Sequence, residues 1–263
     1  MFKILLIGDI VGRCGQDLIS KHLPVLKEQH QIQLCVANAE NASGGLGIDA
    51  MSARHLQRAG VDLMTLGNHA WAKQGWIKDC DDFPNICRPL NGPPSWPGFD
   101  HVVSTTESGV KVLLINLHGQ VFNHNFDNPF VAIEQKLDTW RDKYCPQVIL
   151  VDFHAEATAE KIAMGYYLQD RVSVVFGTHT HVQTADERIL GAGTAYITDL
   201  GMTGPGDGII GMSKNAGIRR FAHSLPARYE VETQGASTLQ GAIVSIDETT
   251  GRAQSIERLM IWE

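Results

Sequence analysis

The chain has 263 residues, of which 43% are hydrophobic, and its formal net charge at neutral pH is -7. This length and composition are enough for one sizeable core, so we expect a single domain over residues 1–263. The acidic balance argues against an extensive nucleic-acid-binding surface, because phosphate backbones are held by clustered lysine and arginine. It is compatible with a small phosphate substrate, since bound metal ions can reverse the local field.

The first two-thirds of the chain alternates short apolar runs with helical stretches, a pattern typical of βαβ units around a largely parallel sheet. Strands are predicted at residues 3–7, 34–37, 62–66, 148–153, 172–176 and 195–198. Helices are predicted at residues 16–28, 49–59, 129–144 and 157–167, the second of them capped by Asp49. Residues 102–106 and 111–117 both alternate in polarity and predict a hairpin.

Two other segments have a different character. Residues 81–99 are rich in proline, glycine and asparagine and are predicted to form an irregular loop. From residue 227 onward the pattern turns to β structure, with strands predicted at residues 228–233, 239–247 and 253–261. The pattern does not place the glycine-rich loop at residues 204–208.

The cysteines and the N-terminus bear on the cellular compartment. There are five cysteines, an odd number, and none forms a C-x-x-C pair: Cys14, Cys35, Cys80, Cys87 and Cys145. We interpret them as free thiols in a reducing cytoplasm, with a thiol ligand or a disulfide between Cys80 and Cys87 as alternatives. The apolar run at residues 4–7 is too short for a signal peptide or a membrane span. We therefore expect a cytoplasmic protein with no membrane partner.

Polar side chains follow five of the predicted strands. In open parallel sheets, ligands bind beyond the carboxyl ends of the strands, so these side chains are expected at one edge. The five groups are Gly8-Asp9, Asn38-Ala39-Glu40-Asn41, Gly67-Asn68-His69, Asp152-Phe153-His154 and Gly177-Thr178-His179-Thr180-His181. The pattern predicts one site built from carboxylates, amides and imidazoles.

This set of donor groups indicates a metal centre. Imidazole, carboxylate and amide oxygen together suit Mn²⁺, Fe²⁺ or Zn²⁺, whereas calcium and magnesium sites of nearly all oxygen would not need three histidines. The six candidate ligands are Asp9, Glu40, Asn68, His154, His179 and His181. Six are more than one tetrahedral ion needs, so we predict two ions that share a bridging carboxylate. In an extended segment, His179 and His181 would lie on the same face and could reach different ions.

Several residues have a second explanation. Asp9 could cap a helix, and His154 could be a hydrogen-bonded core histidine. His118 follows the apolar run at residues 112–117 and could face the substrate, or support the metal ligands, from the same edge. Asp152 and Asp199 could orient the histidines. The glycines of the loop at residues 44–47 either allow the backbone to approach a ligand or make a flexible turn.

Taken together, these motifs resemble the calcineurin-like metallophosphoesterases. That resemblance implies an α/β fold in which a β-sandwich of two mixed sheets is flanked by helices. Within this superfamily the chain resembles the YmdB-like branch, bacterial phosphodiesterases that hydrolyse 2′,3′-cyclic nucleotides. The resemblance covers essentially the whole length and includes residues 8–12, 38–42, 44–47 and 177–205.

Two departures from the wider superfamily match this branch. Ile10 and Val11 follow Asp9, where the superfamily has Asp-x-His, and the bridging position holds Glu40 instead of aspartate. In the branch, the amide after the bridging glutamate fills the vacant coordination position. The resemblance therefore implies one metal held by Asp9, Asn41 and His181, another held by Asn68, His154 and His179, and a bridge formed by Glu40. His69 would face the substrate.

The expected function is metal-dependent hydrolysis of small phosphodiesters, with 2′,3′-cyclic nucleotides as the first candidates. A hydroxide shared by two divalent or trivalent ions would attack the phosphorus, and His69 would act as the general acid. Iron or manganese is expected ahead of zinc or magnesium. One alternative is a phosphomonoesterase or nucleotidase with the same metals. Another is a regulator of signalling or RNA metabolism with a basic stripe at Arg219, Arg220 and Arg228. Homo-oligomerisation is also expected from the family.

Overall fold

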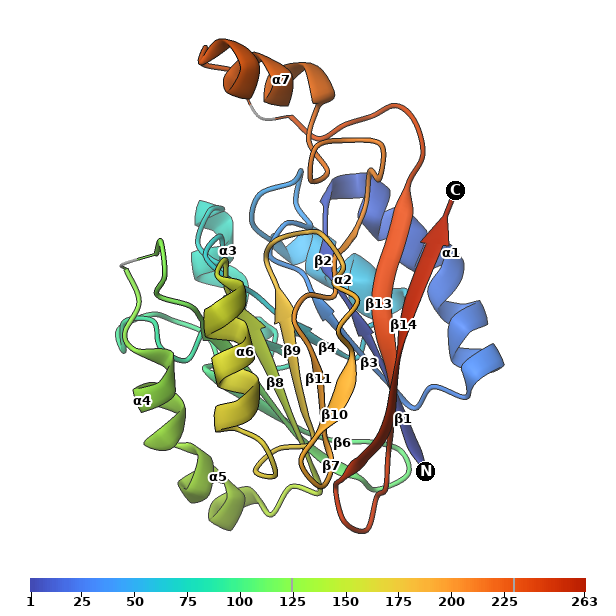
Figure 1. Cartoon of the computed structure of the whole chain (residues 1–263), viewed down its shortest axis with the longest axis vertical. Coiled ribbons are helices and arrows are strands. Elements are labelled where there is room, and N and C mark those ends of the chain that lie inside the picture. The colour runs from blue at the N-terminus through green and yellow to red at the C-terminus, as the bar shows by residue number, and fades with distance from the viewer. Residues whose placement is uncertain (124, 229) are drawn as a thin grey trace.

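The computed structural model describes residues 1–123, 125–228 and 230–263. Two six-stranded sheets face each other, and helices cover the outer side of each (Figure 1). The strand order is β14-β13-β1-β3-β4-β5 in the first sheet and β10-β11-β9-β8-β7-β6 in the second. Both sheets are mixed. In the first sheet β1, β3, β4 and β5 are parallel, and β13 and β14 add antiparallel pairs at one end. In the second sheet β7, β8, β9 and β11 are parallel, and the edge strands β6 and β10 pair antiparallel. The predicted α/β sandwich is confirmed.

The elements have the following bounds. The first sheet contains β1 (Phe2–Ile7), β3 (Leu34–Asn38), β4 (Leu63–Thr65), β5 (Ile86–Cys87), β13 (Thr238–Ile246) and β14 (Ala253–Trp262). The second contains β6 (His101–Thr105), β7 (Lys111–His118), β8 (Val148–His154), β9 (Val174–Thr178), β10 (Arg188–Leu190) and β11 (Thr194–Ile197). A separate parallel pair is formed by β2 (Asp9–Ile10) and β12 (Met202–Thr203). The helices are α1 (Gly12–His30), α2 (Ala50–Arg58), α3 (Gln74–Asp79), η1 (Cys80–Asp82), α4 (Pro129–Glu134), α5 (Leu137–Tyr144), α6 (Thr158–Tyr167) and α7 (Lys214–His223).

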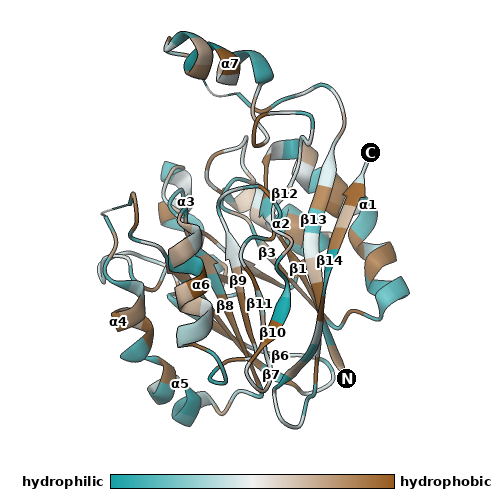
Figure 2. Ribbon diagram, in the orientation of Figure 1, coloured by the Kyte–Doolittle hydropathy of each residue, from teal (hydrophilic) through white to brown (hydrophobic). Residues whose placement is uncertain are grey.

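The core has three apolar layers, because the central strands are buried on both faces. On β1, Ile4 and Leu6 belong to the layer between the sheets, whereas Leu5 and Ile7 belong to the layer under α1 and α2. A third layer lies between the second sheet and helices α4, α5 and α6. Figure 2 shows the apolar residues concentrated on the central strands, while the outer helices carry both apolar and polar residues.

Three predictions about secondary structure are wrong. The helix expected at residues 129–144 is two helices, α4 and α5, and the predicted loop at residues 81–99 contains η1 and β5. Apart from Tyr229, which lies outside the described residues, the expected strand at residues 228–233 has only an isolated bridge, between Val231 and Met212. That segment bonds to the loop at residues 209–213 and not to a sheet edge, with hydrogen bonds from Ser213 N to Glu230 O and from Glu232 N to Gly211 O. Helix α7 was not predicted.

All five cysteines are free, so the alternative of a disulfide between Cys80 and Cys87 is wrong. Burial raises the pKa of the Cys35 and Cys87 thiols, which keeps both protonated at neutral pH. Within residues 1–123, 125–228 and 230–263, no helix combines the length and apolar character needed to span a membrane.

Candidate metal centre

The carboxyl ends of the parallel strands of both sheets meet, and the polar residues that follow these strands lie together there. Glu40 follows β3 in the first sheet, and His154 ends β8 in the second. Nε2 of His154 lies 3.1 Å from Oε1 of Glu40, so this contact joins the two sheets across the site. The predicted convergence of strand ends is therefore a feature of the fold.

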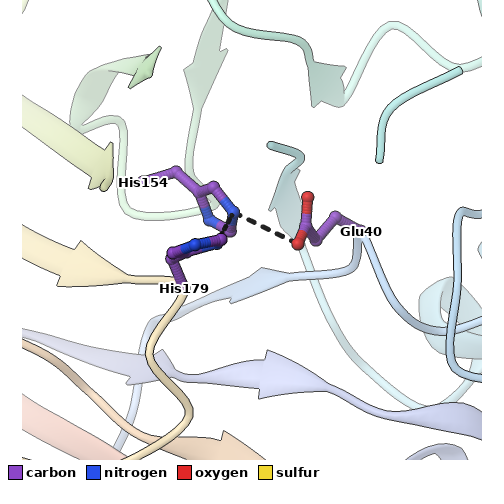
Figure 3. A group of neighbouring side chains, drawn as sticks. All are labelled: Glu40, His154 and His179. Atoms are coloured by element: carbon purple, nitrogen blue, oxygen red, sulfur yellow. Dashed lines mark hydrogen bonds and ion pairs between the residues drawn. The ribbon is translucent and has the colours of Figure 1, made fainter. Parts of the chain in front are cut away.

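Glu40, His154 and His179 form a compact group whose donor atoms all lie within 4.8 Å of one another (Figure 3). Nδ1 of His179 lies 3.0 Å from Nε2 of His154. Oδ1 of Asn68 lies 3.1 Å from the same nitrogen. Glu40 and His154 are fully buried, and four donor atoms packed this closely can hold a metal ion.

A second group of donors lies close to Glu40. Oδ1 of Asp9 lies 3.8 Å from Nε2 of His181 and 3.8 Å from Nδ1 of His154. Nδ2 of Asn41 lies 3.2 Å from Nε2 of His181 and 3.2 Å from Oε1 of Glu40. Rotation of the Asn41 amide would exchange its nitrogen and oxygen, which would place a metal-ligating oxygen beside His181.

Asp9 gives an independent test of whether these residues fit a cation. Its side chain is completely buried, and its Oδ2 accepts a hydrogen bond of 3.0 Å from the backbone N–H of His179. Its Oδ1 has no hydrogen-bond partner among the described residues. A buried carboxylate oxygen left without a partner is costly, and a cation at this position would remove that cost. The residues therefore fit a metal centre.

Each histidine uses its other ring nitrogen to bind a different orienting partner. Nδ1 of His154 lies 2.8 Å from Oγ1 of Thr178, which donates a hydrogen bond of 2.7 Å to Asp152. Nε2 of His179 lies 3.2 Å from Oε2 of Glu156. Such partners fix the orientation and tautomer of a metal-ligating imidazole. The suggestion that Asp152 orients a histidine fits this geometry, whereas the sequence analysis missed Glu156.

The third histidine, His181, is oriented by the main chain, because its Nδ1 lies 2.9 Å from the carbonyl oxygen of Ile210. Ile210 belongs to the long segment that connects β12 to β13, residues 204–237, which we call the excursion. No local sequence signal marks this contact. The carboxylate of Glu156 could have been noticed, since it stands two residues beyond the end of β8.

The segment with His179 and His181 is not extended, so the reason given for the two side chains sharing a face is wrong. The backbone φ angle is 99° at His179 and 63° at His181, which are left-handed conformations that are rare outside glycine. Asp199 holds this segment, because its Oδ2 accepts hydrogen bonds from the backbone N–H (3.1 Å) and hydroxyl (2.8 Å) of Thr180. The buried ammonium of Lys161 lies 2.6 Å from the same oxygen. Backbone strain of this kind is concentrated at functional sites.

The structure shows why a glycine, Gly67, precedes Asn68 and His69. A β-carbon at this position would collide with Oε2 of Glu40 and with the imidazole of His154. Only a residue without a side chain lets β4 end this close to both ligands.

The protonation states suit metal binding. Burial lowers the pKa of His154 and His179 to about 4 and also lowers the pKa of His181. All three imidazoles are therefore neutral near pH 7. Burial favours a raised pKa at Glu40, but the neighbouring His154 and His69 outweigh it, so the Glu40 pKa lies below its usual value. Burial, together with the charge of Glu40, raises the pKa of Asp9.

His69 faces an open cavity beside these groups. Its Nδ1 lies 3.0 Å from Oδ1 of Asn41 and 3.3 Å from Oε1 of Glu40. Burial would lower its pKa, but the carboxylate of Glu40 outweighs this effect, so the pKa is raised. The cavity has a volume of about 560 Å³, within the usual range for small-molecule sites. It is lined by Glu40, Asn41, Gly44, Gly45, Leu46, His69, Glu156, His179, Thr180, His181, Ile210 and Met212.

His118 lies behind the site and does not line this cavity. It is buried, its ring is stacked on Phe126 at a centroid distance of 3.9 Å, and its Nδ1 contacts the carbonyl oxygen of Gly119. Burial lowers its pKa to about 3. The structure does not support a substrate-facing role for His118. Its ring lies 5.5 Å from that of His154 and 6.3 Å from that of His179, centroid to centroid, so a role in supporting these histidines stays a prediction.

The two mixed sheets give the chain a metallophosphoesterase-like fold, and the carboxylate, amide and imidazole donors at their meeting edge form a group that could hold a metal ion. The chain belongs to the YmdB-like protein family, which matches residues 5–259. It is 44% identical to the 2′,3′-cyclic-nucleotide 2′-phosphodiesterase of Bacillus subtilis over 259 residues, covering 98% of this chain and 97% of the relative. A second relative, from Mycoplasma genitalium, is 36% identical over 265 residues and is named a putative phosphatase/phosphodiesterase.

Two solved structures share the whole fold. A hypothetical protein from Thermus thermophilus has a TM-score of 0.91 and 35% identity, with 100% of each chain covered. A phosphatase from Mycoplasma pneumoniae has a TM-score of 0.92 and 33% identity, covering 100% of this chain and 94% of that chain.

Proposed function

We propose that this chain, acting as one domain over residues 1–263, is a metal-dependent phosphodiesterase that hydrolyses 2′,3′-cyclic nucleotides. The observation that carries the proposal is the position of Glu40, whose Oε1 lies 3.1 Å from Nε2 of His154 and 3.2 Å from Nδ2 of Asn41, one residue from each set of donors. One carboxylate between two sets of donors is the arrangement expected for a bridge between two cations. The name of the 44% identical relative supports the substrate class.

In this proposal the two sets of donors hold separate ions. Asn68, His154 and His179 would hold one ion, and Asp9, Asn41 and His181 would hold the other, with Glu40 shared between them. The neutral imidazoles and the unpartnered Oδ1 of Asp9 support this assignment. Nitrogen and oxygen donors in this proportion favour iron or manganese, with zinc or magnesium as alternatives.

Bound divalent cations would supply positive charge that polarises the phosphate oxygens and acidifies a water molecule. In the hydrolysis, the oxygen of water forms a bond to phosphorus, and the bond between phosphorus and O2′ breaks. The departing O2′ then needs a proton. His69 is suited to give it, because the imidazole is partly exposed to the cavity and Glu40 raises its pKa. The product is a nucleoside 3′-monophosphate.

A substrate panel measured together with metal analysis tests this proposal. The purified chain would be offered 2′,3′-cyclic nucleotides, 3′,5′-cyclic nucleotides and nucleoside monophosphates, and its metal content would be determined. We expect the highest kcat/KM on the 2′,3′-cyclic compounds and loss of turnover after chelation. Preference for monoesters would instead support a phosphomonoesterase, an alternative that the phosphatase from Mycoplasma pneumoniae makes reasonable.

A further inference from the structure

The cavity beside the metal centre is lined by both polar and large apolar side chains. Leu46, Ile210 and Met212 line the same cavity as Glu40 and His69. Leu46 is 46% exposed and Ile210 is 48% exposed. A wall of large apolar side chains beside convergent polar groups is typical of a site that binds an organic ligand. We call Leu46, Ile210 and Met212 the apolar wall.

Ile210 is held in an unfavourable conformation at this wall. Its φ angle is 49°, in the left-handed region, which is a genuine outlier for a β-branched residue. Its carbonyl oxygen lies 2.9 Å from Nδ1 of His181, so the same backbone unit that orients a candidate ligand also sets the position of the Ile210 side chain. Such an outlier points to a functional constraint at this residue.

Tight packing places the two halves of the wall next to each other, although they are distant in sequence. A β-carbon at Gly45 would collide with Cγ2 of Val231 and would lie 3.3 Å from Cε of Met212. Gly45 therefore allows the loop that carries Leu46 to approach the excursion that carries Ile210 and Met212. The close neighbours of Gly45 are thus side chains of the protein itself, and the expected approach of a ligand to the loop at residues 44–47 stays a prediction.

We infer that the apolar wall is the subsite for the nucleobase of the substrate, an inference that rests on the proposed function. The phosphate lies at the polar side chains, and the base packs on Leu46, Ile210 and Met212. These three side chains offer no hydrogen-bonding nitrogen or oxygen, and methionine adapts to different shapes. The wall therefore selects substrates that carry a base while distinguishing poorly between bases.

The test compares a nucleotide with the same substrate lacking its base. For each variant, kcat/KM is measured on adenosine 2′,3′-cyclic phosphate and on abasic ribose 2′,3′-cyclic phosphate. The value for the nucleotide is then divided by the value for the abasic compound to give a ratio. The variants are Ile210→Asn, because asparagine tolerates a left-handed φ, and Leu46→Ala. The matched control is Ile218→Asn, since Ile218 is 52% exposed on α7 and does not line the cavity.

We expect each wall variant to lower the ratio by about tenfold or more, since loss of an apolar contact costs roughly 10–200-fold in discrimination. The control variant should keep the ratio of the unchanged protein. A fall of less than tenfold in either wall variant overturns the inference and leaves the proposed function intact. Absence of turnover on every 2′,3′-cyclic compound overturns the proposed function itself.

The four nucleobases provide a second readout. The unchanged protein should hydrolyse the four 2′,3′-cyclic nucleotides with kcat/KM values within about 100-fold of one another, the limit of apolar selection. A larger preference for one base would show that hydrogen bonds read the base, which contradicts the apolar wall as its subsite.

Discussion

Nε2 of His154 lies 3.1 Å from Oε1 of Glu40, although the two residues come from different sheets. This contact exists because both residues stand at the carboxyl ends of buried parallel strands that end at the same place. The sandwich therefore buries apolar surface and also brings donor groups from the first sheet, such as Glu40, next to donor groups from the second sheet, such as His154. Packing at this meeting point and the proposed proton transfer and metal binding can be tested with separate substitutions.

Gly67→Ala should damage the site, because the new β-carbon would collide with Glu40 and His154. We expect a loss of about 1–3 kcal/mol in the free energy of unfolding, the usual cost of forcing extra volume into a packed site. Denaturant titration measures it. Gly75→Ala is the control, since nothing lies within 4 Å of a β-carbon at that position. Equal effects of the two substitutions would contradict the packing described at Gly67.

His69→Ala should lower kcat by about 10²- to 10⁴-fold while the metal content stays close to that of the unchanged protein. The reason is that the proposal gives His69 a proton-transfer role beside the ligands and not among them. Steady-state kinetics and elemental analysis on the same sample check both parts. Loss of metal in parallel with activity would show that His69 is a ligand.

Glu156→Gln should weaken metal binding by about 10- to 100-fold, because a charged partner of His179 is replaced by a neutral one. Titration of metal-free protein with Mn²⁺, followed by calorimetry, measures the affinity. Glu107→Gln serves as the control, since Glu107 is exposed in the hairpin turn between β6 and β7. An unchanged affinity in Glu156→Gln would show that Glu156 does not support the metal centre.

Protonation of His154 and His179 in the metal-free protein should occur near pH 4, because burial lowers both pKa values. In the unfolded chain these histidines titrate near pH 6.5. Between about pH 6.5 and pH 4 the unfolded state thus binds more protons, and each histidine reduces stability as the pH falls. His154→Gln should make the denaturation midpoint depend less on pH in this window. NMR titration midpoints near 6.5 would contradict the burial of these rings.

Much of the site could be predicted because its residues are adjacent to strong strand patterns. Asp9, Glu40, Asn68 and His154 each follow or end an apolar run, and the rule for parallel sheets places them together. The nearby glycines were also visible, although the collision that Gly67 avoids depends on distances in the folded chain.

The remainder of the site depends on contacts that leave no local pattern. Ile210 reaches His181 from an excursion in which only a ten-residue helix, α7, is regular among the described residues (Figure 1). Strands of two or three residues, such as β5 and β12, are too short to show a period. The left-handed backbone at His179 and His181 is imposed by Asp9 and Asp199, which are distant in sequence. Such non-local constraints explain why the extended geometry expected there was wrong.

The central claim is that Glu40 is shared by two cations, and the number of ions bound per chain tests it most directly. Elemental analysis of the purified protein and of Glu40→Gln, combined with Mn²⁺ titration, gives this number. We predict two ions in the unchanged protein. In Glu40→Gln we predict a loss of metal affinity of at least about 100-fold, which is more than the loss expected when a residue that only supports a ligand is replaced. Two tightly bound ions in Glu40→Gln, or fewer than two in the unchanged protein, would contradict the claim.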